Sequence, residues 1–267
     1  MSNRATQRAA VTVVIPAYNA EKLIAKTLES VQRQTYLDWN VIVVDDGSTD
    51  ATREVVKNFS AADARISLLA LDRNHGAPAG PRNRAVAVAE GQWIAFLDAD
   101  DIWHPQKLEL QMLQLARYGA RFCCSAMQDF SNDAEVKDPR YEDPISTRWL
   151  TFSQNRFKGR IPSSSVVVAT ELIRTFQFEE DPTYKAVEDY HCWLRILRSG
   201  VKCLRIDLPL LHYRISPAQI SRSKFTMAKR IYNLHRKFER TTSAAAALFT
   251  LTHVAGGVYL RYLRGKL

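Results

Sequence analysis

Two aspartates separated by one residue are the side chains in this sequence best suited to bind a metal ion. Asp98 and Asp100 follow the uncharged run QWIAFL (92–97), which predicts a buried strand ending just before them. Alternate side chains of extended backbone lie on the same side, so both carboxylates would face one point while Asp101 points away. Carboxylate oxygens suit Mg²⁺ or Mn²⁺, which often complete their coordination with substrate phosphates. For such a pair alone, a solvated turn or a helix cap is the alternative.

The segments before these aspartates alternate between strand and helix patterns. Uncharged runs predict strands over 11–18, 39–44 and 66–71. Apolar residues at helical spacing predict helices over 20–34, 51–59 and 81–90. Asn19 is expected to cap the first of these helices, and Gly91 to follow the last as its terminating residue. This order predicts an α/β fold, in which ligands bind at the carboxyl ends of the strands, so the acids at 45–46 and 98–101 should share one cleft.

The second half of the sequence has a looser pattern. Helices are predicted over 104–118 and 188–197, and strands over 120–127, 161–169 and 202–211. The polar segment 128–160 is expected to be an irregular loop, which at this length is usually functional.

Six short motifs occur in one order along the chain. They are VVIPAYN (13–19), VVDDGSTD (43–50), NHGAPAGPRN (74–83), FLDADD (96–101), EDYHCWLR (188–195) and HYR (212–214). In sequence and spacing they resemble family 2 of the inverting glycosyltransferases, over about residues 11–221. The resemblance implies a GT-A fold, a Rossmann-like mixed and mostly parallel sheet flanked by helices, and a nucleotide-diphosphate sugar as donor.

The resemblance implies a nucleotide-binding role for the first two motifs. Residues matching Pro16, Ala17, Tyr18 and Asn19 form a wall around the base and ribose in similar enzymes. The residue matching Asp46 binds the uracil ring, whose N3–H is a donor that a carboxylate can accept. The alternative for either acid of the second motif is to cap the next helix.

The resemblance also implies a set of residues around the diphosphate. Arg82 would contact the diphosphate or ribose, the alternative being a surface arginine opposite Glu90. Asp98 would bind the ribose or the metal, and Asp100 would bind the metal, Mn²⁺ or Mg²⁺, which bridges the two phosphates. His212 would be a further metal ligand or a phosphate contact, the alternative being a hydrogen-bonded histidine at a strand end.

Asp189 is the candidate catalytic base. Acids in the first turn of a helix ordinarily interact with the helix dipole, but the E-D-x-x-x-W spacing resembles the family's base motif. An ionised Asp189 would take the proton of the acceptor hydroxyl as that oxygen attacks the anomeric carbon. The Q-x-x-R-W motif of processive members is absent, which favours transfer of one sugar. Ser216 stands where the family's YR-x-H ending has histidine, so no role is carried over to it.

The C-terminal segment differs in charge from the rest. Residues 222–267 hold ten Lys or Arg and one acid, whereas residues 1–221 have no net charge. Residues 225–238 form a basic amphipathic pattern, and 241–260 carry no charge. We therefore divide the chain into a transferase domain (1–221) and a basic helical extension (222–267). This extension could span a bilayer, bind an anionic membrane surface, or pack on the body or on a second subunit of a homo-oligomer.

The cysteine spacing, the first residues and the absence of two loop motifs argue against several other classes of protein. The four cysteines form no C-x-x-C pair, which predicts buried reduced thiols, and the first ten residues show no secretory signal. The residues that follow the first strand lack the G-x-G-x-x-G motif of dehydrogenases. They also lack the Gly- and Lys-containing loop of sugar nucleotidyltransferases. We expect no nucleic-acid partner.

Together these features predict a cytoplasmic enzyme, peripheral on the inner face of the membrane. It would move one sugar from a UDP-sugar to a hydroxyl of a glycan or lipid-linked acceptor in cell-surface polysaccharide synthesis. The alternative is an inactive module that binds a nucleotide sugar or a membrane surface.

Overall fold

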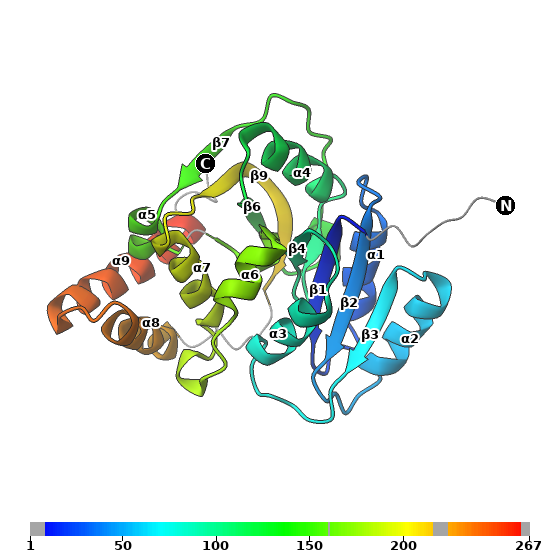
Figure 1. Ribbon diagram of the computed structural model, residues 1–267, viewed down its shortest axis with the longest axis horizontal. Helices are drawn as coiled ribbons and strands as arrows, with labels where there is room; N and C mark the ends of the chain where they lie inside the picture. Colours follow the sequence, from blue (N-terminus) through cyan, green and yellow to red (C-terminus); the bar gives the residue numbers. More distant parts are fainter. Residues whose placement is uncertain (1–8, 160, 216–223, 263–267) are drawn as a thin grey trace.

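The computed structural model describes residues 9–159, 161–215 and 224–262. These residues form one central sheet with helices on both faces, and two further helices lie at the end of the molecule away from β3 and α2 (Figure 1). The strands are β1 (Val11–Ala17), β2 (Trp39–Asp45), β3 (Ile66–Ala70), β4 (Trp93–Phe96), β5 (Ile102–Trp103), β6 (Phe122–Phe130), β7 (Thr147–Leu150), β8 (Val167–Ala169) and β9 (Cys203–Arg214). The helices are α1 (Ile24–Gln32), α2 (Thr52–Ala62), α3 (Ala79–Val88), α4 (Lys107–Tyr118), α5 (Phe152–Phe157), α6 (Thr170–Phe176), α7 (Glu188–Arg198), α8 (Lys224–Phe238) and α9 (Ser243–Tyr262).

The sheet has the order β3-β2-β1-β4-β8-β6-β9-β5, and β7 pairs with β9. Its first four strands are parallel, and β6 is parallel to β9. In contrast, β8 runs antiparallel to both β4 and β6. This arrangement confirms the predicted mixed α/β class and the strands predicted from the uncharged runs.

Alternate residues of the central strands lie on opposite faces of the sheet and belong to two separate hydrophobic cores. Val13 and Val43 pack with α1, α2 and α4 on one face. Val14 and Val44 pack with α3, α6 and α7 on the other, where Trp193 is fully buried. All four cysteines are buried free thiols, as predicted.

Two predicted helix ends are wrong. Asn19 does not cap α1, which begins at Ile24; instead it adopts a left-handed backbone with φ of 49°. Gly91 does not terminate α3 as a left-handed residue, because the helix ends at Val88 and the chain then extends. A side chain at Gly91 would collide with Thr12, since a Cβ there would lie 2.8 Å from its Oγ1, so this glycine permits close packing against β1.

The segment predicted as an irregular loop contains regular structure. Strand β6 extends to Phe130, β7 pairs with β9, and α5 begins after Thr151. Thr151 and Gln154 form a reciprocal capping box at that helix, a signal present in the sequence.

The C-terminal extension forms the two predicted helices, α8 and α9. The boundary placed at residue 221 lies outside the described residues. One face of the pair packs on the body, because Ile231 and Leu234 share a buried cluster with Val187, Tyr190 and Leu194 near and on α7. No helix in the described part of the chain is both long and apolar enough to cross a bilayer.

Candidate active site

The carboxyl ends of the parallel strands bring the predicted donor-binding residues to one edge of the sheet. Ala17, at the end of β1, pairs with Asp45 at the end of β2, and Val14 pairs with Phe96 just before Asp98. Ala17 is buried, whereas Tyr18 is half exposed at 50% and can contact a ligand. The acids at 45–46 and 98–101 therefore follow strands that end at the same edge of the sheet.

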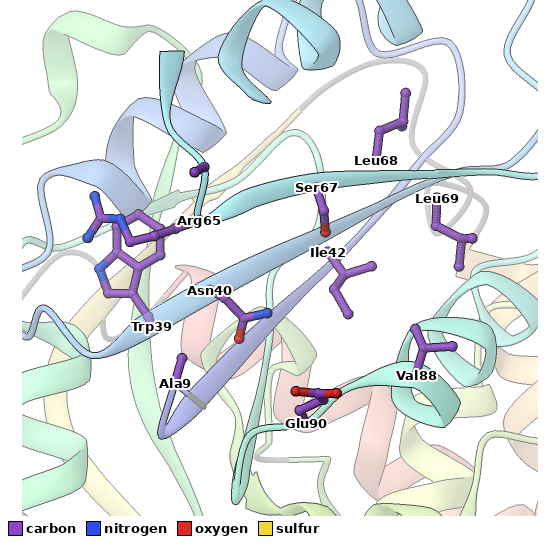
Figure 2. A pocket seen from close by; sticks show the side chains of 11 residues that line it. Ala9, Trp39, Asn40, Ile42, Arg65, Ser67, Leu68, Leu69, Val88 and Glu90 are labelled. Carbon is purple, nitrogen blue, oxygen red and sulfur yellow. The ribbon is translucent and has the colours of Figure 1, made fainter. Parts of the chain in front are cut away.

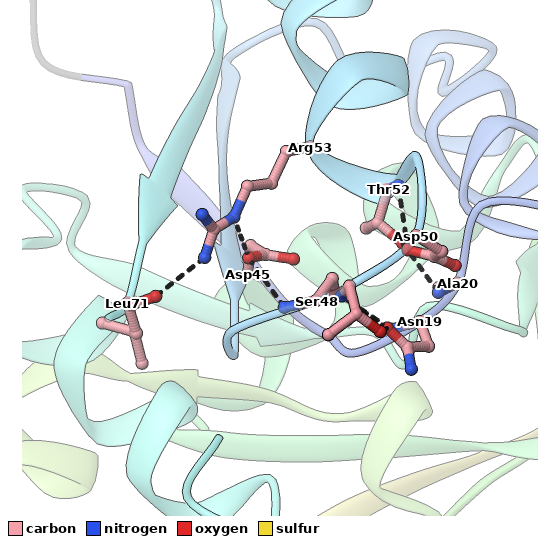
Figure 3. A network of polar contacts seen from close by, with 9 residues as sticks. Asn19, Ala20, Asp45, Ser48, Asp50, Thr52, Arg53 and Leu71 are labelled. Atoms are coloured by element: carbon pink, nitrogen blue, oxygen red, sulfur yellow. Dashed lines mark hydrogen bonds and ion pairs between the residues drawn. The ribbon is translucent and has the colours of Figure 1, made fainter. Parts of the chain in front are cut away.

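A polar network braces the loops that follow β1 and β2 (Figure 3). The Asn19 side-chain oxygen accepts a hydrogen bond from the backbone N–H of Thr49 at 2.9 Å. Asp45 accepts from the Ser48 amide at 3.2 Å and from Arg53 Nε at 2.5 Å. Asp45 is fully buried and therefore holds the loop rather than facing a ligand.

Asp46 is linked to the 74–83 motif. Its carboxylate accepts from the backbone N–H of His75 at 3.0 Å, and its Oδ1 lies 2.6 Å from His75 Nδ1. A carboxylate has about four lone-pair positions, so these contacts leave capacity for a further donor. Gly47, with φ of 72°, allows the backbone of Arg73 and Asn74 to approach the loop after β2, because a Cβ at Gly47 would lie 2.8 Å from that backbone.

Arg82 lies at the centre of the acidic residues. It is 2% exposed and donates to Asp98 Oδ1 at 2.6 Å and to Glu188 Oε1 at 3.3 Å. Burial alone would lower the pKa of Arg82, but the charges of Asp98, Glu188 and Asp189 raise it above its ordinary value. The alternative of a surface arginine opposite Glu90 is therefore wrong. Within the described residues, Arg82 Nε is buried and has no hydrogen-bond acceptor.

The two acids at the start of α7 differ from ordinary surface carboxylates. Burial and the neighbouring Asp189 raise the pKa of Glu188 to about 7. Burial also raises the pKa of Asp189, while the charge of Arg82 opposes that rise. Glu188 is directly paired with Arg82, whereas Asp189 is only partly buried and accepts from the N–H of Tyr190 at 2.6 Å. A carboxylate with a raised pKa is a stronger general base than an exposed aspartate.

The D-x-D loop is held in place from several sides. The backbone N–H of Asp98 donates to Ser164 Oγ at 3.1 Å, and the Thr27 hydroxyl lies 2.9 Å from the carbonyl oxygens of Ala99 and Asp101. Asp101 is fully buried, and its Oδ1 accepts from the backbone N–H of Arg214 at 3.0 Å. Asp101 therefore faces away from the edge, as predicted, and fixes the loop that carries the other two aspartates.

Asp98 and Asp100 suit a divalent ion that brings further ligands with it. The Asp98 side chain is 34% exposed and Asp100 is partly exposed, so both can reach a ligand at the sheet edge. Throughout the described ranges, no three His, Cys, Asp or Glu side chains form a group that could bind a metal alone. Two hard carboxylates would therefore need phosphate oxygens or water to complete the shell.

His212 lies in a different environment from the two aspartates. It is 1% exposed, pairs with Ile102 across β5 and β9, and has Nε2 2.9 Å from Asp138 Oδ1. The geometry favours the hydrogen-bonded histidine over the metal ligand.

A hollow of about 640 Å³ lies elsewhere (Figure 2). Trp39 and Arg65 lie at the amino ends of β2 and β3 and form part of its wall, with the Arg65 guanidinium 3.7 Å from the Trp39 ring centre. This hollow is at the opposite end of the parallel strands from Asp98 and contains none of the predicted site residues.

Comparison with known proteins identifies the family of this chain. The family model described as glycosyl transferase family 2 matches residues 12–179. The chain belongs to glycosyl transferase family 2. One relative, the Escherichia coli UDP-Glc:alpha-D-GlcNAc-diphosphoundecaprenol beta-1,3-glucosyltransferase WfgD, is 32% identical over 249 residues, which cover 93% of each chain. Family 2 enzymes invert the anomeric centre, so this chain is an inverting glycosyltransferase.

Solved structures show that this family 2 transferase has the predicted GT-A fold. The S. aureus TarS fragment 1–349 in complex with UDP-GlcNAc aligns over 96% of this chain and 77% of its own, with 19% identity and a TM-score of 0.69. The mannosyltransferase PcManGT from Pyrobaculum calidifontis, in complex with GDP-Man and Mn²⁺, aligns over 97% of this chain and 71% of its own, with 19% identity and a TM-score of 0.67.

Several residues of the site were not predicted from the sequence. The sequence assigned Glu188 no role beyond its position next to the candidate base. Its pairing with Arg82 joins residues 106 positions apart in the chain. Ser164 and Arg214 support the D-x-D loop. The run SSS at 163–165 and the HYR motif are recognisable in the sequence, but neither pattern indicates that its residues contact the D-x-D loop.

Proposed function

We propose that this family 2 transferase moves one sugar from a UDP-sugar to a hydroxyl of a lipid-linked glycan acceptor. The observation that carries the proposal is the buried Arg82, which joins Asp98 of the donor edge to the acidic start of α7. The Escherichia coli relative named above acts with UDP-Glc on a diphosphoundecaprenol-linked sugar, which supports both substrate classes. Such an acceptor would belong to cell-surface polysaccharide synthesis.

Asp189 would be the base of this reaction. Its carboxylate takes the proton of the acceptor hydroxyl while that oxygen forms a bond to the anomeric carbon. The bond from this carbon to the diphosphate oxygen breaks in the same step, and the nucleoside diphosphate leaves with the electron pair. One displacement inverts the anomeric centre.

The donor would lie along the edge formed by Pro16, Ala17, Tyr18, Asn19 and Asp46. Asp46 would accept from the uracil ring, and the charge of Arg82 would attract the diphosphate or ribose. Asp98 and Asp100 would hold Mn²⁺ or Mg²⁺, which supplies positive charge to the leaving diphosphate when bound. These residues would keep the diphosphate in place while the sugar is transferred.

The C-terminal helices would bind an anionic membrane surface where a lipid-linked acceptor resides. Leu248 and Leu251 of α9 are 53% and 67% exposed, and Phe225 of α8 is 83% exposed. Arg236 and Lys237 are also exposed on α8 and would attract acidic lipid headgroups. This placement would put the enzyme on the inner face of the membrane.

Replacement of the base tests the reaction. Asp189→Asn should leave UDP affinity unchanged in calorimetry and reduce transfer turnover by about 100- to 10,000-fold. Asp181→Asn is the matched control, because Asp181 is an exposed aspartate shortly before the same helix and should not affect turnover. Unchanged turnover in Asp189→Asn would remove this residue from the mechanism.

A further inference from the structure

The helix that carries Asp189, α7, packs against residues of the two C-terminal helices, α8 and α9. We propose that α8 and α9 position Asp189 through Tyr190, so that the C-terminal extension contributes to the catalytic step and is not only an attachment to a surface. This inference rests on the role of base proposed for Asp189.

Tyr190 connects the base to the far side of α7. Its backbone N–H donates to Asp189 Oδ1 at 2.6 Å, while its phenol oxygen lies 2.9 Å from the carbonyl oxygen of Arg156 and 3.2 Å from that of Asn155. Tyr190 is 8% exposed, and burial raises the pKa of its hydroxyl, which therefore stays a hydrogen-bond donor. The residue next to the base is thus fixed at both its backbone and its side chain.

The ring of Tyr190 is enclosed by the extension. The ring of His253, on α9, meets it edge-to-face with centroids 4.9 Å apart. The ring of His235, on α8, approaches with centroids 6.1 Å apart. Ile231 and Leu234 of α8 complete the apolar cluster around Tyr190. Because protein interiors are closely packed, a displacement of either helix would be transmitted to this ring.

A buried ionic network holds the two helices in place. Glu239, just after α8, lies 2.6 Å from Arg156 Nε and 2.7 Å from His235 Nδ1, and its side chain is 5% exposed. The guanidinium of Arg156 also lies 3.8 Å from the ring centre of Phe249 on α9. Arg156 therefore makes two kinds of contact. Its backbone carbonyl accepts a hydrogen bond from the Tyr190 hydroxyl, and its side chain binds Glu239 and Phe249 of the extension.

Gly159 adds a tight contact between the body and α9. Its backbone N–H donates to His253 Nδ1 at 3.3 Å, and a Cβ at this position would lie 2.7 Å from His253 Cε1. The His253 ring that packs on Tyr190 is thus also held by the backbone of Gly159.

Arg82 connects the donor edge to α7 through Glu188, whereas the C-terminal extension contacts α7 through Tyr190. Asp46 and Asp98 belong to the edge built by β2 and β4, where they contact His75, Arg82 and Ser164. Loosening the contact between α7 and the extension should therefore change the catalytic step without changing nucleotide affinity. A role in stability alone would change the unfolding midpoint but not the turnover of the folded molecules.

Two variants of the full chain test the inference. Tyr190→Phe removes the hydroxyl and keeps the ring, and Glu239→Gln removes the charge that binds Arg156 and His235. Both should retain UDP affinity by calorimetry and lose about 10- to 100-fold in kcat, counted per UDP-binding molecule, because misplacement of a reacting group is costly. Tyr232→Phe on α8 and Glu29→Gln on α1 are the matched controls and should leave kcat unchanged.

Counting turnover per UDP-binding molecule excludes unfolded protein from the comparison. Unchanged kcat in both Tyr190→Phe and Glu239→Gln, with Asp189→Asn inactive, would overturn this inference and leave the proposed function intact. If Asp189→Asn also retained full turnover, the proposed function itself would fail.

Discussion

Arg82 Nη2 lies 2.6 Å from Asp98 Oδ1, and this ion pair joins α3 to the D-x-D loop. The same guanidinium reaches Glu188 at 3.3 Å, so one positive charge lies among carboxylates that would otherwise repel one another. The charge also reduces the repulsion that these acids would exert on a diphosphate.

Replacing Arg82 should therefore affect both stability and binding. Arg82→Met keeps most of the side-chain volume but leaves the buried Glu188 unpaired, and we expect the free energy of unfolding to fall by about 3–5 kcal/mol. UDP affinity should also fall. Denaturant unfolding and calorimetry measure the two effects, with Arg84→Met as control because that arginine is exposed. Wild-type stability in Arg82→Met would show that the buried pairs contribute little.

Asp100 should make nucleotide binding depend on metal. In the wild-type protein, UDP affinity measured with Mn²⁺ should drop when a chelator is added. In Asp100→Ala the affinity should be low and insensitive to chelator, whereas the exposed Asp72→Ala should behave as the wild type. A chelator-sensitive affinity in Asp100→Ala would assign the metal to other ligands.

His191 should make the protein less stable in acid. It stacks on Tyr184 with ring centroids 4.3 Å apart, and burial lowers the pKa of His191 to about 4, with the charge of Arg195 acting in the same direction. The ordinary pKa is about 6.5, so between these pH values the unfolded chain binds the extra proton and folding stability falls as pH falls.

The variant His191→Phe isolates this effect, because it keeps an aromatic ring against Tyr184 and cannot titrate. The stability of the wild type relative to the variant should decrease by up to about 1.4 kcal/mol per pH unit as the pH falls from 6.5 to 4. Urea unfolding at several pH values measures the difference, and a constant difference would contradict the assignment.

The exposed apolar residues of α9 should be needed for membrane binding. Replacing Leu248 and Leu251 with serine removes apolar area that could enter a lipid surface, so sedimentation with vesicles of acidic lipid should decrease. Leu37→Ser is the control, since Leu37 is 71% exposed at another place in the fold. Undiminished sedimentation of the double variant would exclude this face as the contact.

The sequence predicted the parallel half of the fold because its strands are local and strongly patterned. The run VTVVIPA is uncharged and β-branched, and it forms β1 as a strand buried on both faces. In contrast, β7 was missed because its stability comes from pairing with β9, more than 50 residues away, as in the register of Leu150 with Cys203. A four-residue strand has too short a pattern to be recognised without its partner.

The same distinction applies to the site. Asp98, Asp100 and Asp189 were predicted because each lies in a short motif. The role of Glu188 depends on Arg82, and that of Asp101 depends on the amide of Arg214, contacts that no local pattern specifies. The helix cap predicted at Asn19 was wrong, because its side chain accepts from Thr49 rather than from α1.

The pairing of Arg82 with Glu188 limits how halves of related enzymes can be exchanged. The parallel strands that precede residue 97 and the helices that follow residue 187 are far apart in sequence, so a hybrid chain could take each from a different parent. An imported second half that lacked an acid at position 188 would leave the guanidinium buried with one partner fewer. Compatible charge at this pair is therefore a condition for recombining donor and acceptor specificities.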